Sequence, residues 1–163
     1  MSNFKLPNVI EFKAPNQIID SLKFDYRYFL AGSIEMGKAS DWQKEFIETI
    51  HSSFGFVLGD YAIYNPRRDK WDASLEQVYE NPTLYQQVNW ELTALEWATK
   101  VYFYFDPNTT SPISLLELGI FKDKAIVNCP DGYCRKANVD IICEKYKIQQ
   151  VKSHKEAIKK LFK

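Results

Sequence analysis

The chain has 163 residues, 45% of them hydrophobic, and lysine plus arginine equal aspartate plus glutamate at 21 each. This length suits one domain that buries about two thirds of its unfolded surface, so the fold needs neither a disulfide nor a structural metal. The balanced charge excludes the basic field that would hold a polymeric nucleic acid or an acidic membrane surface, although it is compatible with a single nucleotide.

The cysteines indicate a reduced, cytoplasmic protein. Cys129, Cys134 and Cys143 are odd in number and form no CxxC pair, and the two histidines, His51 and His154, lie far from them in sequence. Three thiolates without a fourth ligand would make an unusual zinc site, so we expect no metal and no other cofactor. The N-terminus lacks an apolar run of signal-peptide length, and no segment approaches the ~18 apolar residues of a membrane span. We therefore expect no membrane partner.

The N-terminal part divides into an extension and the start of the main domain. Residues 1–25 contain two prolines and one short apolar segment, so we expect them to pack on a domain formed by residues 26–163. Residues 26–30 have the aromatic and apolar content of a buried strand. This strand leads into Gly32, which either permits close approach of a ligand or serves a tight turn.

A helix and a second strand follow. Ser40 and Gln43 have the spacing of a capping box, which predicts a helix start. Apolar residues of this helix recur at the spacing of one buried face: Trp42, Phe46, Ile47 and Ile50. Residues 61–64 are predicted to form a strand that ends in the polar loop of residues 65–72.

The second half of the chain alternates between helix and strand. Further helices are predicted around residues 84–97, at Glu117, at residues 138–145 and after the Ser153–Glu156 capping box, with strands at residues 101–105 and 125–128. Strands and helices that alternate over short connections predict an α/β fold. We expect a three-layer sandwich with a mostly parallel sheet of about five strands between helical layers.

Polar residues follow the carboxyl ends of three predicted strands, where open α/β sheets bind ligands. Residues 32–35 follow the first strand, residues 65–72 the second and residues 106–117 the third. We expect these loops to converge on one cleft.

Glu117 is the residue best suited to chemistry within that cleft. It lies among leucines, about two turns into a helix that Ser111 is expected to cap and Pro112 to start, with Ser114 one turn earlier on the same face. A carboxylate enclosed in this way must be paired, protonated or used. The alternative is that Glu117 lies on the solvent side of an amphipathic helix. As a nucleophile, it would attack the anomeric carbon of a sugar and form a covalent glycosyl intermediate.

Retaining chemistry also uses a second acidic group near the leaving group. The acidic residues in or near the predicted cleft are Asp69, Asp72, Glu91 and Asp106, of which we favour Asp72. Arg67 and Arg68 present planar charged groups suited to a phosphate or a carboxylate, or else they neutralise acidic residues of the same loop. Aromatic side chains suited to stacking on a base are Tyr28, Trp71 and Trp90.

Five motifs occur along the chain, in this order: Phe29-Leu30-Ala31-Gly32-Ser33-Ile34; Asn65-Pro66-Arg67-Arg68 with Trp71-Asp72; Gln87 with Trp90-Glu91; Pro112-Ile113-Ser114-Leu115-Leu116-Glu117-Leu118-Gly119; and Asn138-Val139-Asp140. Together they resemble the nucleoside 2-deoxyribosyltransferase-like family over roughly residues 26–146, and several motifs are far more specific than one. The resemblance implies a flavodoxin-like or Rossmann-like sandwich. It also implies an enzyme that exchanges the base of a 2-deoxyribonucleoside through a covalent deoxyribosyl-glutamate.

The resemblance assigns roles to particular residues. Glu117 is identified as the nucleophile, and Tyr28 as the strand tyrosine that orients it. Asn138 matches an asparagine that a neighbouring subunit contributes to the sugar site, which implies a homo-oligomer. Beyond these three residues, we predict that substrate binding involves Gly32, Asn65, Arg67, Arg68, Asp69, Trp90, Glu91, Ser111 and Ser114.

Two positions depart from the pattern of the family. Thr99 stands where the transferases commonly carry an aspartate at the start of the central strand, and Ser111 stands where they carry one six residues before the nucleophile. The base-side proton donor and the sugar-hydroxyl contact are therefore left open. With a serine at position 111, this part of the chain resembles the related deoxynucleotide hydrolases, in which serines and a basic residue hold a 5′-phosphate. A nucleotide substrate therefore also fits.

The leading prediction is an enzyme that cleaves the N-glycosidic bond of a 2-deoxyribonucleoside or its 5′-monophosphate and transfers the deoxyribosyl group to another base. Hydrolysis, with water as the acceptor, is the nearest alternative. A non-catalytic nucleotide-binding sensor module is a second, favoured by Thr99 and Ser111, and cleavage of a larger N-glycoside such as NAD is a third.

Overall fold

The computed structural model describes residues 9–19, 23–35, 38–53, 59–70, 72 and 74–162. These residues form a six-stranded sheet in the order β1-β3-β2-β4-β5-β6, and every neighbouring pair of strands is parallel. The strands are β1 (Val9–Lys13), β2 (Tyr26–Gly32), β3 (Tyr61–Asn65), β4 (Lys100–Tyr104), β5 (Ala125–Asn128) and β6 (Gln149–Gln150).

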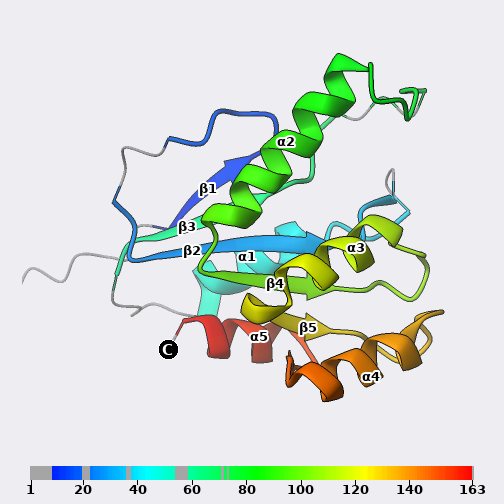
Figure 1. Cartoon of the computed structure of the whole chain (residues 1–163). Helices are drawn as coiled ribbons and strands as arrows, with labels where there is room; N and C mark the ends of the chain where they lie inside the picture. Colours follow the sequence, from blue (N-terminus) through cyan, green and yellow to red (C-terminus); the bar gives the residue numbers. More distant parts are fainter. Residues whose placement is uncertain are drawn as a thin grey trace, which may run out of the picture.

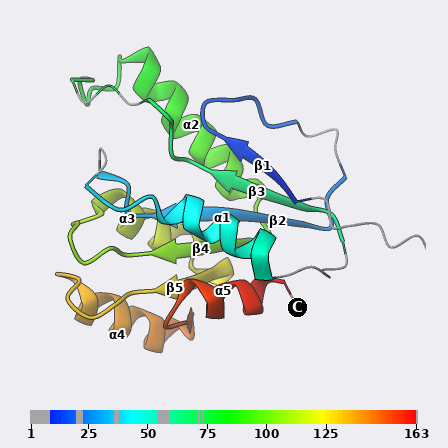
Figure 2. The same cartoon turned by 180° about the vertical axis from the view of Figure 1, so that it is seen from behind.

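Helices cover both faces of the sheet. They are α1 (Trp42–Ser53), α2 (Pro82–Trp97), α3 (Pro112–Phe121), α4 (Lys136–Tyr146) and α5 (His154–Leu161), with a short 3₁₀ helix, η2 (Lys122–Lys124), after α3. Helices α2, α3 and α4 lie on one face (Figure 1), and α1 and α5 lie on the other (Figure 2). The three-layer α/β fold predicted from the sequence is therefore confirmed.

The sheet has one strand more than the five expected. Residues 9–13, within the predicted N-terminal extension, form β1 and pair with β3 at the edge of the sheet. At the other edge, β6 has only two residues, both exposed, so it carries no apolar pattern that a sequence reading can detect. Residues 1–8 lie outside the described part of the chain.

Two apolar clusters fill the space between the sheet and its helices. Because successive side chains of a strand point to opposite faces, each buried strand contributes to both clusters. The strand residues toward α2, α3 and α4 include Phe29, Ala31, Val101, Phe103 and Val127. Those toward α1 and α5 include Tyr28, Leu30, Tyr61, Tyr102 and Ile126, packed on Trp42, Phe46 and Ile50 of α1. The inward face predicted for α1 is thus confirmed.

The helix starts differ in part from those predicted. Ser153 does accept a hydrogen bond from the Glu156 N–H at the start of α5, at 3.1 Å. At α1, however, Asp41 rather than Ser40 accepts from a helix amide, the Lys44 N–H, at 3.2 Å. At α3, Ser111 adopts a left-handed backbone conformation with φ of 46° and makes no capping hydrogen bond with its side chain. The Ser111 hydroxyl is used elsewhere, as described below.

None of the described helices is both long and apolar enough to cross a bilayer. Within the same residues, no group of three or more histidine, cysteine, aspartate and glutamate side chains is placed to hold a metal ion. Cys129 and Cys143 are buried free thiols, and Cys134 is an exposed one.

Candidate active site around Glu117

Glu117 lies on the inner side of α3 and is only 8% exposed. Among the described residues, no hydrogen-bond donor contacts its carboxylate. Burial disfavours the charged form and the negative charge of Glu91 adds to this effect, so the pKa of Glu117 is raised to about 8. The exposed side of α3 instead carries Ile113, Leu116 and Ile120. The solvent-side alternative for Glu117 is therefore wrong, because α3 buries its carboxylate and exposes aliphatic residues.

Glu91, on α2, is held in a polar cluster that acts on Glu117. The Gln87 Nε2 donates to Glu91 Oε1 at 2.6 Å and to the Pro66 carbonyl at 3.1 Å, while the Arg68 Nε donates to Gln87 Oε1. Burial raises the pKa of Glu91 to about 7, against the opposing effects of the Gln87 hydrogen bond and the Arg68 charge. Two interacting carboxyls that titrate near neutrality share their protons as a pair. At such a pH the pair supplies one ionised carboxylate and one proton donor.

Replacing Glu91 by glutamine is expected to lower the pKa of Glu117, because a negative charge that opposes its ionisation is removed. In the residual activity of the variant, whose residue 91 is no longer an acid, the acid limb of kcat/KM against pH therefore moves to lower pH. Profiles of wild type, Glu91→Gln and the control Glu96→Gln, an exposed carboxylate on the same helix, check this. An acid limb that stays in place in Glu91→Gln would contradict the coupling.

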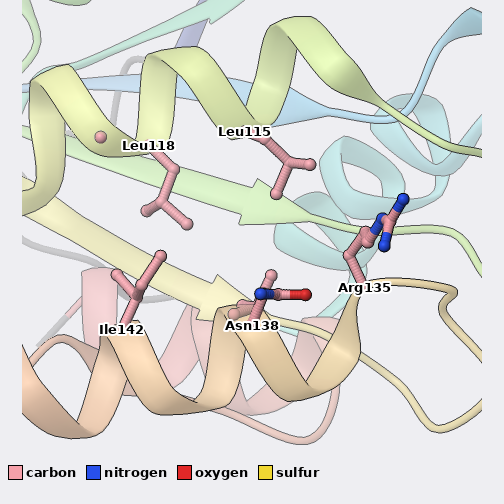
Figure 3. Close-up of a pocket in the computed structure, with 7 residues that line it drawn as sticks. Leu115, Leu118, Arg135, Asn138 and Ile142 are labelled. Carbon is pink, nitrogen blue, oxygen red and sulfur yellow. The ribbon is translucent and has the colours of Figure 1, made fainter.

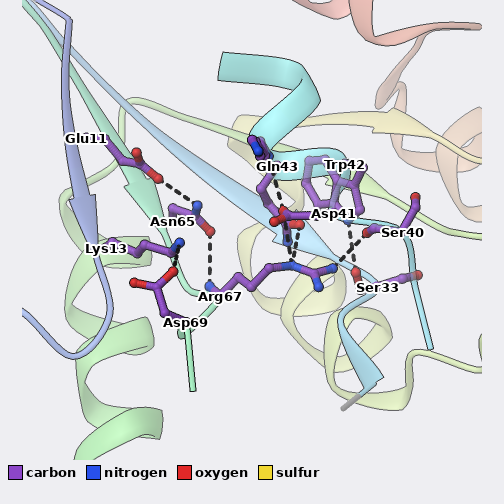
Figure 4. Close-up of polar contacts among 11 residues, drawn as sticks. Glu11, Lys13, Ser33, Ser40, Asp41, Trp42, Gln43, Asn65, Arg67 and Asp69 are labelled. Atoms are coloured by element: carbon purple, nitrogen blue, oxygen red, sulfur yellow. Dashed lines mark hydrogen bonds and ion pairs between the residues drawn. The ribbon is translucent and has the colours of Figure 1, made fainter. Parts of the chain in front are cut away.

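A second polar network follows β3 and joins it to α1 (Figure 4). The Asn65 Nδ2 donates to Glu11 Oε1 at 2.7 Å, and Asn65 Oδ1 accepts from the Arg67 N–H at 3.0 Å. The Arg67 guanidinium donates to Gln43 Oε1 at 2.9 Å and to the Ser40 carbonyl at 2.8 Å. Asn65 and Arg67, both predicted to bind substrate, are thus engaged within their own chain.

The ion pairs of this network also differ from those expected. Arg67 lies 3.4 Å from Asp41 at the start of α1, and Asp69 pairs with Lys13, the last residue of β1. Arg67 and Asp69 are therefore neutralised by residues of other elements.

Three hydroxyls gather where β2 and β4 end and α3 begins. The Ser33 and Ser111 Oγ atoms are 2.6 Å apart, and the Thr109 Oγ1 lies 2.7 Å from Ser33 Oγ and 2.8 Å from Ser111 Oγ. The Asp106 N–H also donates to Ser33 Oγ, at 2.8 Å. Beside this cluster, the Glu35 carboxylate accepts hydrogen bonds from Thr110 and Ser111. The predicted convergence of the loops after the first and third expected strands is confirmed by these contacts.

Tyr28 lies on the wrong side of the sheet for its predicted role. Its hydroxyl donates to the Leu161 carbonyl of α5, and its ring belongs to the apolar cluster beneath α1 and α5. Helix α3, which carries Glu117, covers the opposite face. Because neighbouring strand residues alternate, Phe29 and not Tyr28 faces α3. The predictions that Tyr28 orients Glu117 or stacks on a base are therefore wrong.

Asp72 has the properties of a permanently ionised surface carboxylate. It is exposed, and its Oδ1 accepts from the Ser74 hydroxyl at 2.6 Å and from the Ser74 N–H at 2.9 Å. These hydrogen bonds lower the pKa of Asp72. A proton donor at neutral pH needs the opposite shift, which Glu91 has. Trp71, beside Asp72, lies outside the described residues.

Trp90 and Gly32 have structural contacts that explain their residue types. The Trp90 Nε1 donates to the Asn16 carbonyl at 2.8 Å, which ties α2 to the segment after β1. Gly32 pairs with Tyr104 across β2 and β4, and its φ is +136°. A Cβ built on Gly32 would lie 2.1 Å from the Tyr104 carbonyl oxygen, so the glycine serves close approach of two backbones.

Asn138 lines an apolar groove of about 320 Å³ between α3 and α4, where it faces Leu115 and Leu118 (Figure 3). Glu117 is not part of this lining and lies on the side of α3 that interacts with Glu91 of α2. The structure therefore does not bring Asn138 together with Glu117 of the same chain. Ser114, by contrast, is buried on α3 within one turn of Glu117.

Comparison with known families agrees with these features. The family model described as "Nucleoside 2-deoxyribosyltransferase like" matches residues 25–133, more than half of the chain. The matched range contains Glu35, Glu91, Ser111 and Glu117 and ends before Asn138. A search of curated proteins gave no match. The match confirms the resemblance seen in the motifs, and the chain belongs to the nucleoside 2-deoxyribosyltransferase-like family.

Proposed function

We propose that the protein cleaves the N-glycosidic bond of a 2-deoxyribonucleoside or its 5′-monophosphate and transfers the deoxyribosyl group to another base. The observation that supports this most strongly is the buried Glu117 carboxylate, which has no donor among the described residues and is coupled to Glu91. A carboxylate in a low-dielectric site stabilises a developing cation more than one in water does. The transition state of glycosyl transfer has this cationic character.

In the proposed reaction, a Glu117 carboxylate oxygen attacks C1′ while the bond from C1′ to the base nitrogen breaks. The bonding electrons pass to the base, which takes a proton from Glu91, our candidate donor in place of Asp72. A second base then attacks C1′, returns a proton to Glu91 and releases Glu117. Water in place of the second base gives hydrolysis. The reaction needs the arrangement with the proton on Glu91 and the charge on Glu117. Because Glu117 has the higher pKa of the two, this is the less populated of the two singly protonated arrangements in the protein alone.

Base exchange tests the proposal directly. The protein is incubated with purine and pyrimidine 2′-deoxynucleosides and their 5′-monophosphates, with and without a second base, and the products are separated by chromatography. A new nucleoside or nucleotide indicates transfer, and free base that forms without an acceptor indicates hydrolysis. Binding without release of base from any substrate would contradict the proposal and favour a sensor module.

We further propose that the protein is a homo-oligomer in which Asn138 reaches the site of a neighbouring subunit. Large apolar side chains are exposed on the outer faces of α3 and α4: Ile113 at 60%, Leu116 at 61%, Ile120 at 58% and Ile141 at 64%. Several large apolar side chains exposed on neighbouring helices are typical of an interface between subunits. The groove that contains Asn138 lies between the same two helices.

Leu116→Glu is expected to dissociate the oligomer, because the substitution places a charge in the apolar surface of α3. Light scattering after size-exclusion chromatography checks the molecular mass of wild type, Leu116→Glu and the control Val78→Glu, an exposed apolar residue before α2. We expect a monomer for Leu116→Glu alone. A monomeric wild type, or a Leu116→Glu protein of unchanged mass, would contradict this interface.

A further inference from the structure

A second cavity lies on the face of the sheet opposite Glu117. Helices α1 and α5 cover that face (Figure 2), and the cavity of about 560 Å³ lies between them and the carboxyl ends of β4 and β5. Residues 152–155, at the start of α5, form one wall, and Glu45, Thr49 and Ser52 of α1 form the other. Open α/β sheets bind ligands at the carboxyl ends of their strands, so the cavity lies where a ligand is expected.

A buried hydrogen-bond chain supports the cavity from below. The Asn128 Nδ2 donates to the Tyr102 hydroxyl oxygen at 3.1 Å, and that hydroxyl lies 2.8 Å from His154 Nδ1. Tyr102 is fully buried, so its own proton needs an acceptor, and among the described residues His154 Nδ1 is the acceptor in contact with it. Burial lowers the pKa of His154, against the opposing charge of Glu45, so the ring is neutral at neutral pH and carries its proton on Nε2. His154 therefore presents an N–H donor at the cavity.

Asn128 supplies an acceptor to the same cavity. Its side chain is only 4% exposed and lines the cavity, yet its Oδ1 has no hydrogen-bond donor in the described part of the chain. Buried polar atoms nearly always have a partner. An amide oxygen left in this state is suited to a hydroxyl group of a bound molecule. The carboxylate of Glu45, on the opposite wall, is a second acceptor.

The start of α5 supplies donors for an anion. Lys152 and Lys155 line the cavity, and the first amides of a helix have no acceptor within it. The Glu156 N–H already donates to Ser153 Oγ at 3.1 Å, and Glu156 Oε2 in turn accepts from the Lys152 N–H at 2.8 Å. The His154 and Lys155 amides have no such partner among the described residues. Two ammonium groups and two amides at a helix N-terminus favour a phosphate group.

We propose that this cavity binds a small sugar phosphate, with the phosphate at the start of α5 and a sugar hydroxyl on Asn128 Oδ1. The lysines, the two amides and the His154 N–H match the phosphate oxygens, which only accept in the dianionic form. The Asn128 oxygen and the Glu45 carboxylate match hydroxyl donors of the same molecule. Inorganic phosphate uses only the first set of groups, and an uncharged sugar uses only the second. The site is separate from the proposed reaction, because Glu117 lies on the other face of the sheet.

Calorimetry with three probes tests the ligand class. Ribose 5-phosphate, inorganic phosphate and ribose are each titrated into the wild-type protein, a measurement that needs no turnover. We expect ribose 5-phosphate to bind at least ~10-fold more tightly than either of the other two, because it alone reaches both sets of groups. Absence of ribose 5-phosphate binding, or equal affinities for ribose 5-phosphate and inorganic phosphate, overturns the proposal.

Variants place the ligand within the cavity. Lys155→Ala is expected to weaken the binding of ribose 5-phosphate and of inorganic phosphate at least ~10-fold, whereas Asn128→Ala weakens only the binding of ribose 5-phosphate. Lys155 is exposed, so its substitution leaves the fold intact, and circular dichroism checks the fold of both variants. The controls are Lys159→Ala, an exposed lysine on the same helix outside the lining, and Glu117→Gln, and both should bind as wild type does. Unchanged binding in Lys155→Ala, or lost binding in Glu117→Gln, overturns the proposal whether or not base exchange is observed.

Discussion

Glu117→Gln is expected to reduce the release of base by at least ~10³-fold, because an amide cannot form the covalent bond to C1′ that the proposed reaction requires. Glutamine has nearly the same shape as glutamate, so the fold should be retained. Chromatography of released base, with circular dichroism as a check of folding, compares this variant with wild type and with Glu96→Gln. Release of base at the wild-type rate by Glu117→Gln would remove Glu117 from the mechanism.

The same substitution is expected to act on stability with the opposite sign. The pKa of Glu117 is raised from 4.5 to about 8 on folding, so between these pH values the folded state binds a proton that the unfolded state has lost. Stability of wild type therefore falls as the pH rises from about 4.5 to 8. Glutamine has no such loss, and its advantage at pH 8 should be on the order of 1–3 kcal/mol. Urea unfolding of both proteins at pH 6 and pH 8 measures it. A difference that does not grow with pH would show that Glu117 is not buried in the charged form.

Gly32→Ala is expected to destabilise the protein by about 4 kcal/mol or more, which is a large part of the stability of a single domain. The new Cβ would lie 2.1 Å from the Tyr104 carbonyl oxygen and 2.8 Å from the Tyr104 nitrogen. Both are backbone atoms of the adjacent strand β4, so the clash is relieved only if β2 and β4 separate. The φ of +136° adds strain for any residue with a side chain.

Gly119→Ala is the matched control for this prediction. Apart from its chain neighbours and the surrounding helix backbone, no atom lies within 4 Å of a Cβ built at Gly119, in the interior of α3. Alanine there should therefore be neutral or stabilising by about 0.5–1 kcal/mol. Urea unfolding measures both variants. A Gly32→Ala protein within 1 kcal/mol of wild type would contradict the account of Gly32.

The order of the helices and of strands β2, β3, β4 and β5 was predictable because each of these elements carries its own local pattern, which the edge strand β6 lacks. Glu117 was also found from the sequence, since a single acid in an apolar run is unusual whichever way the helix faces. The direction of Tyr28 was not predictable. Tyr28 and Phe29 are both suited to a buried strand, and the side toward which each points depends on which helices cover which face of the sheet.

Contacts that form only through tertiary packing were also missed. Glu91 was one of four acidic candidates in the sequence, and its raised pKa depends on burial that only the folded chain provides. The partner groups of Glu35 include two backbone amides, which every residue except proline has. Residue type alone therefore gives no signal for these contacts, although the glutamate itself lies in one of the polar segments expected at the carboxyl edge of the sheet.

Helix α3 has only ten residues, yet its inner side holds Glu117 and its outer side exposes Ile113, Leu116 and Ile120. The two proposals, reaction at Glu117 and association of subunits, thus both depend on this one helix. A tilt of α3 that repacks the proposed subunit interface would move Glu117 with it. Specific activity would then depend on protein concentration, and dilute and concentrated preparations would differ in rate per subunit.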